Sequence, residues 1–245
     1  MRILVIDIGG SAVKALATGH RAPVRIPSGP SLTPRRMVTA IKRATAGWRY
    51  DAVSIGYPGN VDRGCLVEEA PNLGKGWLRF NFAKAFGCPV KIVNDAAMQA
   101  LGSYHGGRML FLGLGTGLGS ALILDGVLHS MEFGDLPYRH GRTYADYLGK
   151  AALKRMGRTR WSRHAKHAVE QLKSAVQADY TVLGGGQAKL LKTLPSDVVL
   201  GDNSKAFLGG FRLWEQGKGR AAAKVGGPNQ TKPGRCRIRR RGSAR

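Results

Sequence analysis

Short apolar runs alternate along this chain with stretches in which apolar residues recur every three or four positions. The runs predict strands and the spaced pattern predicts helices, so the chain is expected to be an α/β protein. In the first half, strands are expected at residues 3–8, 13–17, 52–56 and 90–93, and helices at 33–46 and 96–104. In the second half, strands are expected at 109–114, 120–124, 180–183 and 198–200, and helices at 144–156, 161–175, 187–191 and 204–215.

Both halves of this pattern begin in the same way, with a strand, a glycine turn and a second strand. The first turn lies within DIGGSAVK, from Asp7 to Lys14, and the second within GLGTGLGS, from Gly113 to Ser120. The repetition predicts a duplicated fold with a cleft between the halves. The expected division is a small N-terminal domain at 1–107, a large domain at 108–203, a helix at 204–216 that packs back on the small domain, and a basic disordered tail at 217–245.

Charge is unevenly distributed along the 245 residues, whose formal net charge is +24. The tail holds ten Lys or Arg and no acid, and it has too few large apolar residues to fold, so it is expected to be a solvated extension or to bind a polyanion. A second basic stretch contains only Asp146 and Glu170 as acids, which predicts either a solvated helix face or an anionic partner. Its ten basic residues are Arg139, Arg142, Lys150, Lys154, Arg155, Arg158, Arg160, Arg163, Lys166 and Lys173.

Other classes of protein are disfavoured by simple patterns. A hydrophobic content of 43% allows a sizeable core, while the longest uncharged run, residues 109–124, is too short and too rich in glycine to span a membrane. The chain enters its first strand directly after Met1 and Arg2, without the pattern of a secretion signal. The cysteines form no CxxC pair for zinc, and His164 and His167 lie among arginines, as surface residues do. We expect a cytoplasmic protein with no zinc site.

The two glycine turns are candidate phosphate sites. Glycine permits conformations in which successive backbone amides point at one anion, although an ordinary tight hairpin would show the same residues. Neither turn matches GxxxxGK[ST] or a GxGxxG that opens a helix, which disfavours P-loop and dinucleotide-binding folds. The candidate ligands, including two hydroxyls and one cation, are Gly9, Gly10, Ser11 and Lys14 in the first turn and Gly115, Thr116 and Gly117 in the second.

Two aspartates lie at the ends of apolar strands, where an unpaired carboxylate is costly. Asp7 is expected to hold a magnesium ion through water, or else to cap the amide of Gly9 or Gly10. Asp95 is expected to accept the proton of a sugar hydroxyl as it attacks phosphorus, or else to cap the helix that follows. Asn94 would then orient a second hydroxyl. A carboxylate base between two phosphate turns indicates a sugar kinase.

Five segments resemble the ROK sugar kinase family in order and spacing: DIGGS at 7–11, VNDA at 93–96, GTGLG at 115–119, MEFG at 131–134 and VLGGG at 182–186. GYPG at 56–59, APNL at 70–73, KGW at 75–77 and the segment around Trp161 resemble its polyphosphate glucokinase branch. The resemblance spans Asp7 to about Glu215. It implies a duplicated actin-like or hexokinase-like (ribonuclease H-like) α/β fold, commonly a homodimer, which uses Mg²⁺ to transfer a phosphoryl group from polyphosphate, ATP or both to the 6-hydroxyl of glucose or a related hexose.

The same resemblance assigns roles to single residues. Asp95 would be the catalytic base, and Asn94 and Glu132 would bind sugar hydroxyls. Asn72 would close over the sugar, or else cap its own loop. Asp135 stands where the family usually has histidine, which puts an anion near the sugar in place of a neutral donor and acceptor. The turns Gly9-Gly10-Ser11 and Gly115-Thr116-Gly117 would hold the donor, and Gly184, Gly185 and Gly186 would line the donor side.

The basic stretch from Arg139 to Lys173 favours polyphosphate as the donor, because a dense polyanion gains most from such a surface. The alternative function is a catalytically silent sugar sensor or regulator of the same family. Regulators carry a helix-turn-helix before the first phosphate turn, and with only six residues before Asp7 we expect a kinase and not a regulator. The basic tail alone would contact nucleic acid, without sequence specificity.

Overall fold

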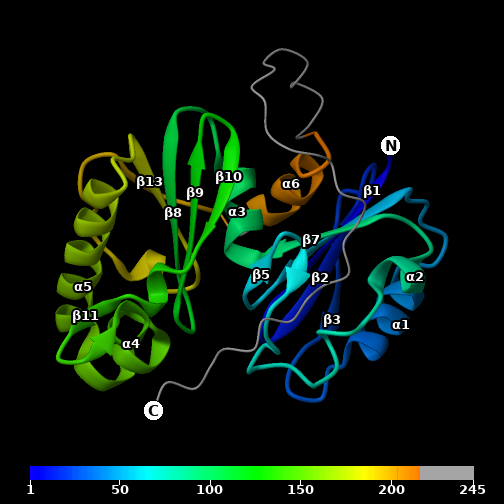
Figure 1. Ribbon diagram of the computed structural model, residues 1–245, viewed down its shortest axis with the longest axis horizontal. Helices are drawn as coiled ribbons and strands as arrows, with labels where there is room; N and C mark the ends of the chain where they lie inside the picture. Colours follow the sequence, from blue (N-terminus) through cyan, green and yellow to red (C-terminus); the bar gives the residue numbers. More distant parts are fainter. Residues whose placement is uncertain (203, 216–245) are drawn as a thin grey trace, which may run out of the picture.

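The computed structural model describes residues 1–202 and 204–215. Its first half forms a five-stranded sheet in the order β3-β2-β1-β4-β7 (Figure 1). The first three strands of this order pair antiparallel, and β4 and β7 extend the sheet in parallel. The strands are β1 (Ile3–Ile8), β2 (Ala12–Ala17), β3 (Val24–Pro27), β4 (Ala52–Tyr57) and β7 (Val90–Asn94). The helices α1 (Pro34–Ala44) and α2 (Phe82–Phe86) lie on its outer side.

The second half repeats this topology in the order β10-β9-β8-β13-β14. Again the first three strands pair antiparallel and the last two join in parallel. The strands are β8 (Arg108–Leu114), β9 (Leu118–Leu124), β10 (Val127–Met131), β13 (Tyr180–Gly184) and β14 (Val198–Leu200). The long helix α5 (Lys150–Ala175) covers the outer side of this sheet (Figure 1). The predicted α/β class and duplicated fold are therefore confirmed.

The central strands are apolar on both faces because helices cover both sides of each sheet. In β1 every residue is buried except Asp7, which is partly exposed. Leu4 and Ile6 pack in one cluster with Met37 and Ile41 of α1. Short elements complete the described chain: β5 (Val61–Asp62), β6 (Cys65–Leu66), η1 (Phe133–Asp135), β11 (Pro137–Arg139), β12 (Arg142–Thr143), α4 (Tyr144–Leu148) and η2 (Ala188–Leu190).

The prediction of one continuous helix at 144–156 is wrong. The chain forms α4, leaves helical geometry at Gly149, and then forms α5, which is interrupted at Gly157 with φ 75°. A side chain on Gly149 would collide with the carbonyl oxygen of Thr116. The amide of Lys150 donates to the carbonyls of Gly115 (3.0 Å) and Thr116 (3.3 Å). The break thus attaches the start of α5 to the second glycine turn.

Two helices lie between the sheets and hold them together (Figure 1). α3 (Asp95–Ser103) packs on β9 and on α6 (Lys205–Arg212), and α6 in turn packs on β1 and β4. A side chain at Gly209 would overlap the carbonyl of Met98, so glycine allows the two backbones to touch. Arg212 donates to the carbonyls of Leu101 (2.7 Å) and Tyr104 (2.9 Å), which stabilises the end of α3.

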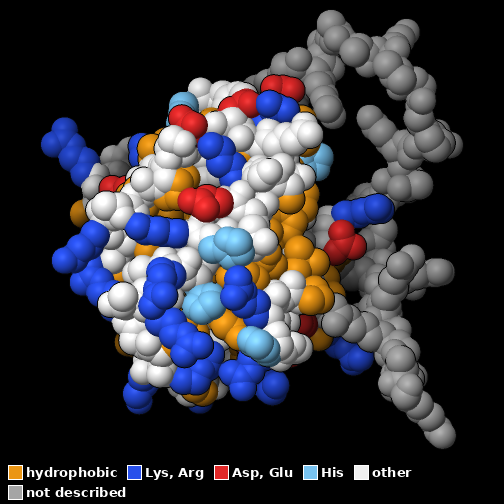
Figure 2. All heavy atoms as spheres, turned by 90° about the vertical axis from the view of Figure 1, so that its left-hand side faces the viewer, with side chains coloured by type: hydrophobic (Ala, Val, Ile, Leu, Met, Phe, Trp, Pro, Cys, Tyr) orange, Lys and Arg blue, Asp and Glu red, His pale blue; other side chains and the backbone are white. Residues whose placement is uncertain are grey.

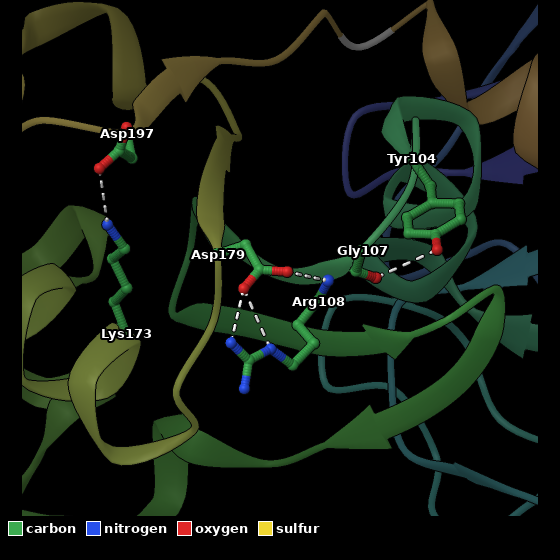
Figure 3. Close-up of polar contacts among 6 residues, drawn as sticks. All are labelled: Tyr104, Gly107, Arg108, Lys173, Asp179 and Asp197. Atoms are coloured by element: carbon green, nitrogen blue, oxygen red, sulfur yellow. Dashed lines mark hydrogen bonds and ion pairs between the residues drawn. The ribbon is translucent and has the colours of Figure 1, made fainter.

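The strand ends farthest from the glycine turns are joined by polar contacts (Figure 3). Arg108, at the start of β8, forms a 2.7 Å ion pair with Asp179, which precedes β13, and its amide donates to the same carboxylate. Lys173 of α5 forms a second ion pair with Asp197 at 3.4 Å. Both pairs are substantially exposed, so each contributes little to stability.

The helix predicted at 204–216 corresponds to α6, and the described chain continues in turns to Glu215. The predicted basic tail at 217–245 lies outside the described residues. Within those residues, no helix is both long enough and apolar enough to span a membrane.

Candidate active site

The carboxyl ends of β1, β4 and β7 meet at one edge of the first sheet. Asp7 is paired with Gly56 on β4 and with Lys14 on β2, and Asn94 is paired with Tyr57 on β4. Asp95 follows Asn94 directly, so the two predicted aspartates lie at the same edge. In open α/β sheets, ligands bind outside the carboxyl ends of the parallel strands.

Asn94, and not Asp95, is the N-cap of α3. Its side-chain oxygen accepts from the amides of Ala96 (2.8 Å) and Ala97 (3.3 Å), and its Nδ2 donates to the carbonyl of Gly59 (3.1 Å). The alternative role considered for Asp95 therefore belongs to its neighbour. The side chain of Asn94 therefore keeps one N–H for a ligand, because its oxygen already accepts two hydrogen bonds.

Asp95 is the first residue of α3. The residue as a whole is partly exposed, but the pKa of its carboxyl is strongly raised. Burial of that carboxyl, and then the charge of Asp7, raise its pKa to about 7, against the opposing effect of the Ala96 amide, which donates to Oδ1 at 2.8 Å. Glu132 adds a smaller upward effect on the pKa. A carboxylate with a pKa near neutrality is suited to general base catalysis.

Asp7 has lost much of its solvent without gaining a hydrogen bond in the described structure. Burial raises its pKa, and Lys14 opposes that change. The amide of Gly9 donates to the carbonyl of Ala12 at 3.0 Å. Asp7 therefore does not cap the Gly9 amide, which was the alternative role considered for it. The Asp7 carboxylate therefore remains available to a ligand.

Two glycines allow the start of α3 to approach both sheets, a role that was not predicted for either of them. A side chain on Gly56 of β4 would lie 2.5 Å from Met98 Cε and 3.5 Å from the Cα of Asp95. A side chain on Gly119 of β9 would lie 2.8 Å from the Cβ of Ala96. Gly119, inside the GLGTGLGS turn, is thus needed for packing.

The second glycine turn and the glycine triplet lie side by side at the corresponding edge of the second sheet. Gly113 of β8 is paired with Gly184 of β13. Gly185 has φ +83°, and a side chain there would collide with the carbonyl of Leu114. The amide of Gln187 donates to that same carbonyl at 3.1 Å. The structure therefore brings together residues 115–117 and 184–186, as the donor-side interpretation requires.

The predicted sugar residues Glu132 and Asp135 are in a turn fixed to β9. The Ser120 hydroxyl donates to the carbonyl of Met131 (2.7 Å) and accepts from the amide of Phe133 (3.0 Å). Although Glu132 is exposed as a residue, partial burial of its carboxyl, and then the charges of Asp135 and Glu68, raise its pKa. Glu68 was not predicted as a site residue, because no local motif marks a loop glutamate whose charge acts on a carboxyl 64 residues away.

Asn72 lies beside the first glycine turn. Its Nδ2 is 3.8 Å from the position that a Cβ on Gly10 would occupy, and among the described contacts it caps no turn of its own loop. The Tyr57 hydroxyl shapes that loop by accepting from the amide of Ala70 (2.7 Å) and donating to the carbonyl of Glu68 (3.1 Å). The Glu69 carboxylate accepts from the amides of Gly76 (3.0 Å) and Trp77 (3.1 Å).

We call the ten basic residues from Arg139 to Lys173 the basic face. Figure 2 shows Lys and Arg side chains crowded on the α5 side of the molecule, with few acids among them. Only Lys173 of the ten forms an ion pair with a described acid. Arg158 donates to the carbonyl of Leu190 at 2.7 and 3.1 Å, which ties α5 to the segment after the glycine triplet. The basic face is therefore attached to the second glycine turn through the backbone amide of Lys150.

His164 is partly buried in an aromatic cluster, so its predicted surface position needs correction. The Tyr138 hydroxyl lies 3.2 Å from its Nδ1, and burial with nearby Arg139, Arg160 and Arg163 lowers its pKa. Within 1–202 and 204–215, no group of three or more His, Cys, Asp or Glu side chains is arranged to hold a metal ion.

Comparison with known proteins agrees with this arrangement. The ROK family model matches residues 3–137. Polyphosphate glucokinase of Mycobacterium tuberculosis is 31% identical over 208 residues, which cover 74% of this chain and 76% of that protein. The inorganic polyphosphate/ATP-glucomannokinase from Arthrobacter sp. strain KM has a similar fold, with TM-score 0.72 and 23% identity over 85% of this chain and 96% of the other.

A ROK family glucokinase from Streptomyces griseus, solved in complex with glucose and AMPPNP, has TM-score 0.70 and 19% identity over 89% of this chain and all of the other. These two structures show a shared fold. The family match covers more than half of the chain and contains the first glycine turn, Asp95, the second glycine turn and Glu132. This chain belongs to the ROK family.

Proposed function

We propose that this protein is a sugar kinase that transfers a phosphoryl group from polyphosphate, ATP or both to the 6-hydroxyl of glucose or a related hexose. The observation that carries the proposal is Asp95, whose carboxyl has its pKa raised to about 7 by burial and by Asp7. It lies at the carboxyl edge of the first sheet and feels the charge of Glu132 from the second half. The similarity to the polyphosphate glucokinase of M. tuberculosis and to the glucomannokinase of Arthrobacter supports phosphoryl transfer to a sugar as the reaction class.

In this mechanism, Asp95 accepts the proton of the attacking hydroxyl as the new oxygen–phosphorus bond forms. Glu132 and Asp135 would bind ring hydroxyls from the turn held by Ser120, and Asn72 would approach the sugar from the loop beside Gly10. The remaining N–H of Asn94 would contribute one more hydrogen bond. Holding the hydroxyl in line with the donor supplies much of the rate increase in such reactions.

The donor would lie between the two glycine turns, with its terminal phosphate near Asp95. The turns offer backbone amides, the hydroxyls of Ser11 and Thr116 and the ammonium group of Lys14. Thr116 is exposed, and glycines 115 and 117 on either side of it are partly exposed. The glycine triplet at 184–186 would allow the donor to approach the backbone closely.

Asp7 fits a magnesium ion bound through water. Its carboxylate accepts no hydrogen bond in the described structure, and Mg²⁺ in phosphoryl-transfer sites is typically held by one or two carboxylates and the substrate phosphates. When bound, the ion neutralises charge that develops on the phosphoryl oxygens.

The basic face supports polyphosphate as a donor. The backbone amide of Lys150 attaches it to the second glycine turn, and nine of its ten residues form no ion pair with a described acid. A linear polyanion that enters the donor site could extend along this face, whereas a nucleotide would reach only the few basic residues nearest the donor site.

Hexose 6-phosphate formation tests the proposal directly. The full chain is incubated with Mg²⁺, either polyphosphate or ATP, and a panel of hexoses that includes glucose and mannose. Transfer to glucose or mannose, faster with polyphosphate, is expected. Equal rates with ATP and no response to polyphosphate would overturn the donor preference. Sugar binding without transfer from either donor would overturn the kinase assignment and favour a silent sensor.

A further inference from the structure

The segment that carries Asn72 is long and irregular, yet firmly anchored. We call residues 67–81, which lie between β6 and α2 and contain no helix or strand, the Asn72 loop. Irregular segments of about this length are uncommon in compact domains and are usually either functional or disordered. Ala70, Leu73 and Trp77 of this loop are buried in the hydrophobic cluster of the first half. The loop is therefore part of the packed structure, which favours a functional role.

One carboxylate closes the Asn72 loop on itself. Glu69 Oε1 accepts from the backbone amides of Gly76 (3.0 Å) and Trp77 (3.1 Å), and Oε2 accepts from the Trp77 amide as well (3.2 Å). Hydrogen bonds to a carboxylate are about twice as strong as those between neutral groups. Gly76 has φ +97°, which L side chains rarely adopt, so glycine allows the turn in which this amide meets Glu69. Glu69 thus joins the two ends of the segment 70–75.

The Asn72 loop is also connected to the first glycine turn through one intermediate segment. The amide of Gly74 donates to the carbonyl of Leu32 at 3.0 Å. A side chain on Gly74 would lie 3.0 Å from the same oxygen, so glycine allows this close approach. In the segment that contains Leu32, the amide of Ser28 donates to the carbonyl of Ser11 at 3.3 Å. Backbone hydrogen bonds therefore link the loop to the turn proposed to hold the donor.

Asn72 is the group that this anchored loop presents to a ligand. It is exposed, and its Nδ2 lies 3.8 Å from the position that a Cβ on Gly10 would occupy. Its side chain forms no hydrogen bond with a described residue, so its carboxamide is available. A side chain on a backbone that is already fixed needs less ordering when a ligand binds, which favours affinity.

We propose that Glu69 is a positioning residue, which holds Asn72 beside the first glycine turn so that Asn72 can contact the sugar. The inference rests on the proposed function, in which Asn72 approaches the sugar. Glu69 acts through the loop and does not touch the substrate. Without its carboxylate, the amides of Gly76 and Trp77 lose their acceptor, and the loop has to be ordered at the moment of binding. Sugar affinity should then fall.

A double-mutant cycle on glucose binding tests whether Glu69 acts through Asn72. Isothermal titration calorimetry on the full chain, without a donor, measures the dissociation constant. Asn72→Ala should weaken glucose binding by about three- to tenfold, as expected for one lost hydrogen bond. Glu69→Ala should cause most of the same loss. The double variant should match Asn72→Ala to within about twofold, because Glu69 then has nothing to position.

Two outcomes of this cycle would overturn the inference. The first is unchanged glucose affinity in either single variant. The second is a double variant in which the two losses multiply, since a residue that merely stabilises the fold, or that contacts the sugar itself, would act independently of Asn72.

Gly76→Ala disturbs the same contact from its other side and leaves the carboxylate in place. Gly19→Ala is the matched control: Gly19 also has a positive φ (+87°), and a side chain at either glycine would meet no atom within 4 Å. Gly19 follows β2 beside the start of β1, whereas Asp7 lies near the end of β1. Gly76→Ala should weaken glucose binding to a similar extent as Glu69→Ala, and Gly19→Ala should leave it unchanged. Equal weakening by both would indicate general backbone strain and overturn the inference.

The inference and the proposed function fail in different ways. Hexose phosphorylation by the wild-type chain, with unchanged glucose affinity in Glu69→Ala, would overturn the inference and leave the kinase in place. Losses of affinity that do not multiply, without phosphoryl transfer from either donor, would support the positioning role and overturn the proposed reaction. Absence of binding of both glucose and mannose by the wild-type chain would overturn both.

Discussion

The carboxyl edge of the first sheet and the basic face of α5 carry opposite charges in opposite settings. At the edge, Asp7 and Asp95 are partly buried, repel each other and are opposed by one cation, Lys14. On the basic face, ten Lys or Arg lie at the surface with only Asp146 and Glu170 among them. The ion pairs of the described chain join neither region to the other.

The two regions differ in how much their charges destabilise the folded state. Burial of a carboxylate disfavours its ionised form, as the raised pKa of Asp95 records. Solvated basic side chains cost little individually, but together they create a field that attracts polyanions. In the proposed function, the acidic edge formed by Asp7 and Asp95 therefore serves the chemistry, and the basic face serves the donor.

The largest effect is expected from Asp95→Asn. If Asp95 is the general base, kcat should fall by about 10²- to 10⁴-fold, because proton transfer by a positioned group contributes that much. Sugar affinity measured by calorimetry should change little, since asparagine keeps the side chain's size and its acceptor oxygen. Asp125→Asn, in the turn that follows β9, provides the control and should retain full activity. Undiminished turnover in the Asp95 variant would remove the acidic edge from the mechanism.

Charge reversal on the basic face should have the next largest effect. The double variant Lys150→Glu with Lys154→Glu should raise KM for polyphosphate on the order of tenfold, because Lys150 is attached to the second glycine turn and Lys154 follows it one helical turn along α5. The matched control is Lys42→Glu with Arg43→Glu on α1, which lies on the outer side of the first sheet. If the control raises KM as much as the test variant, only net charge matters and the basic face has no special role.

The pH dependence of kcat/KM should report the ionisation of Asp95 at the acidic edge. Asp95 acts as a base only when ionised, so kcat/KM should fall as pH decreases below about 7, the raised pKa of Asp95 in the free protein. Because the charge of Asp7 contributes to that elevation, Asp7→Asn should move the acid limb to lower pH even while it reduces activity. An acid limb that stays in place in this variant would show that the two carboxyls are not coupled.

The smallest expected effect is on stability. Since the pKa of Asp95 is higher in the folded than in the unfolded chain, its contribution to stability is present at low pH and is lost as pH rises through about 7. Asp95→Asn should therefore increase the free energy of unfolding at pH 8 by on the order of 1 kcal/mol, with little change at pH 4. Lys154→Gln on the basic face should stay within about 0.5 kcal/mol at both pH values. Denaturant unfolding measures both, and destabilisation of the Asp95 variant at pH 8 would contradict the account.

The sequence predicted the central strands well because both faces of these strands are covered. β1 begins and ends at the predicted residues, and β13 and β14 differ by at most one residue. The edge strands β3 and β10 were missed, since one is only four residues long and the other has five residues that are mostly exposed. The helix break at Gly149 was also missed, because it depends on contact with Thr116, which is distant in sequence.

For the candidate site, the two aspartates and the glycine turns could be located from the sequence. Which of two adjacent residues takes which role could not be decided from it. Asn and Asp are equally good N-caps, so only the structure shows that Asn94 fills this role. Glu68 was missed because its relation to Glu132 exists only after both halves have folded. Gly119 was grouped with the phosphate turn, although its lack of a side chain serves packing against Ala96.

The central claim is that the basic face recognises the polyphosphate donor and takes no part in binding the sugar, which lies beside Asp95 and Glu132. The most direct measurement is the dependence of the two KM values on salt concentration, with glucose and polyphosphate varied in turn on the wild-type chain. The account predicts that KM for polyphosphate rises steeply with salt, while KM for uncharged glucose stays nearly constant. A KM for polyphosphate that does not respond to salt, or a glucose KM that rises in parallel with it, would contradict the division of charge between the two regions.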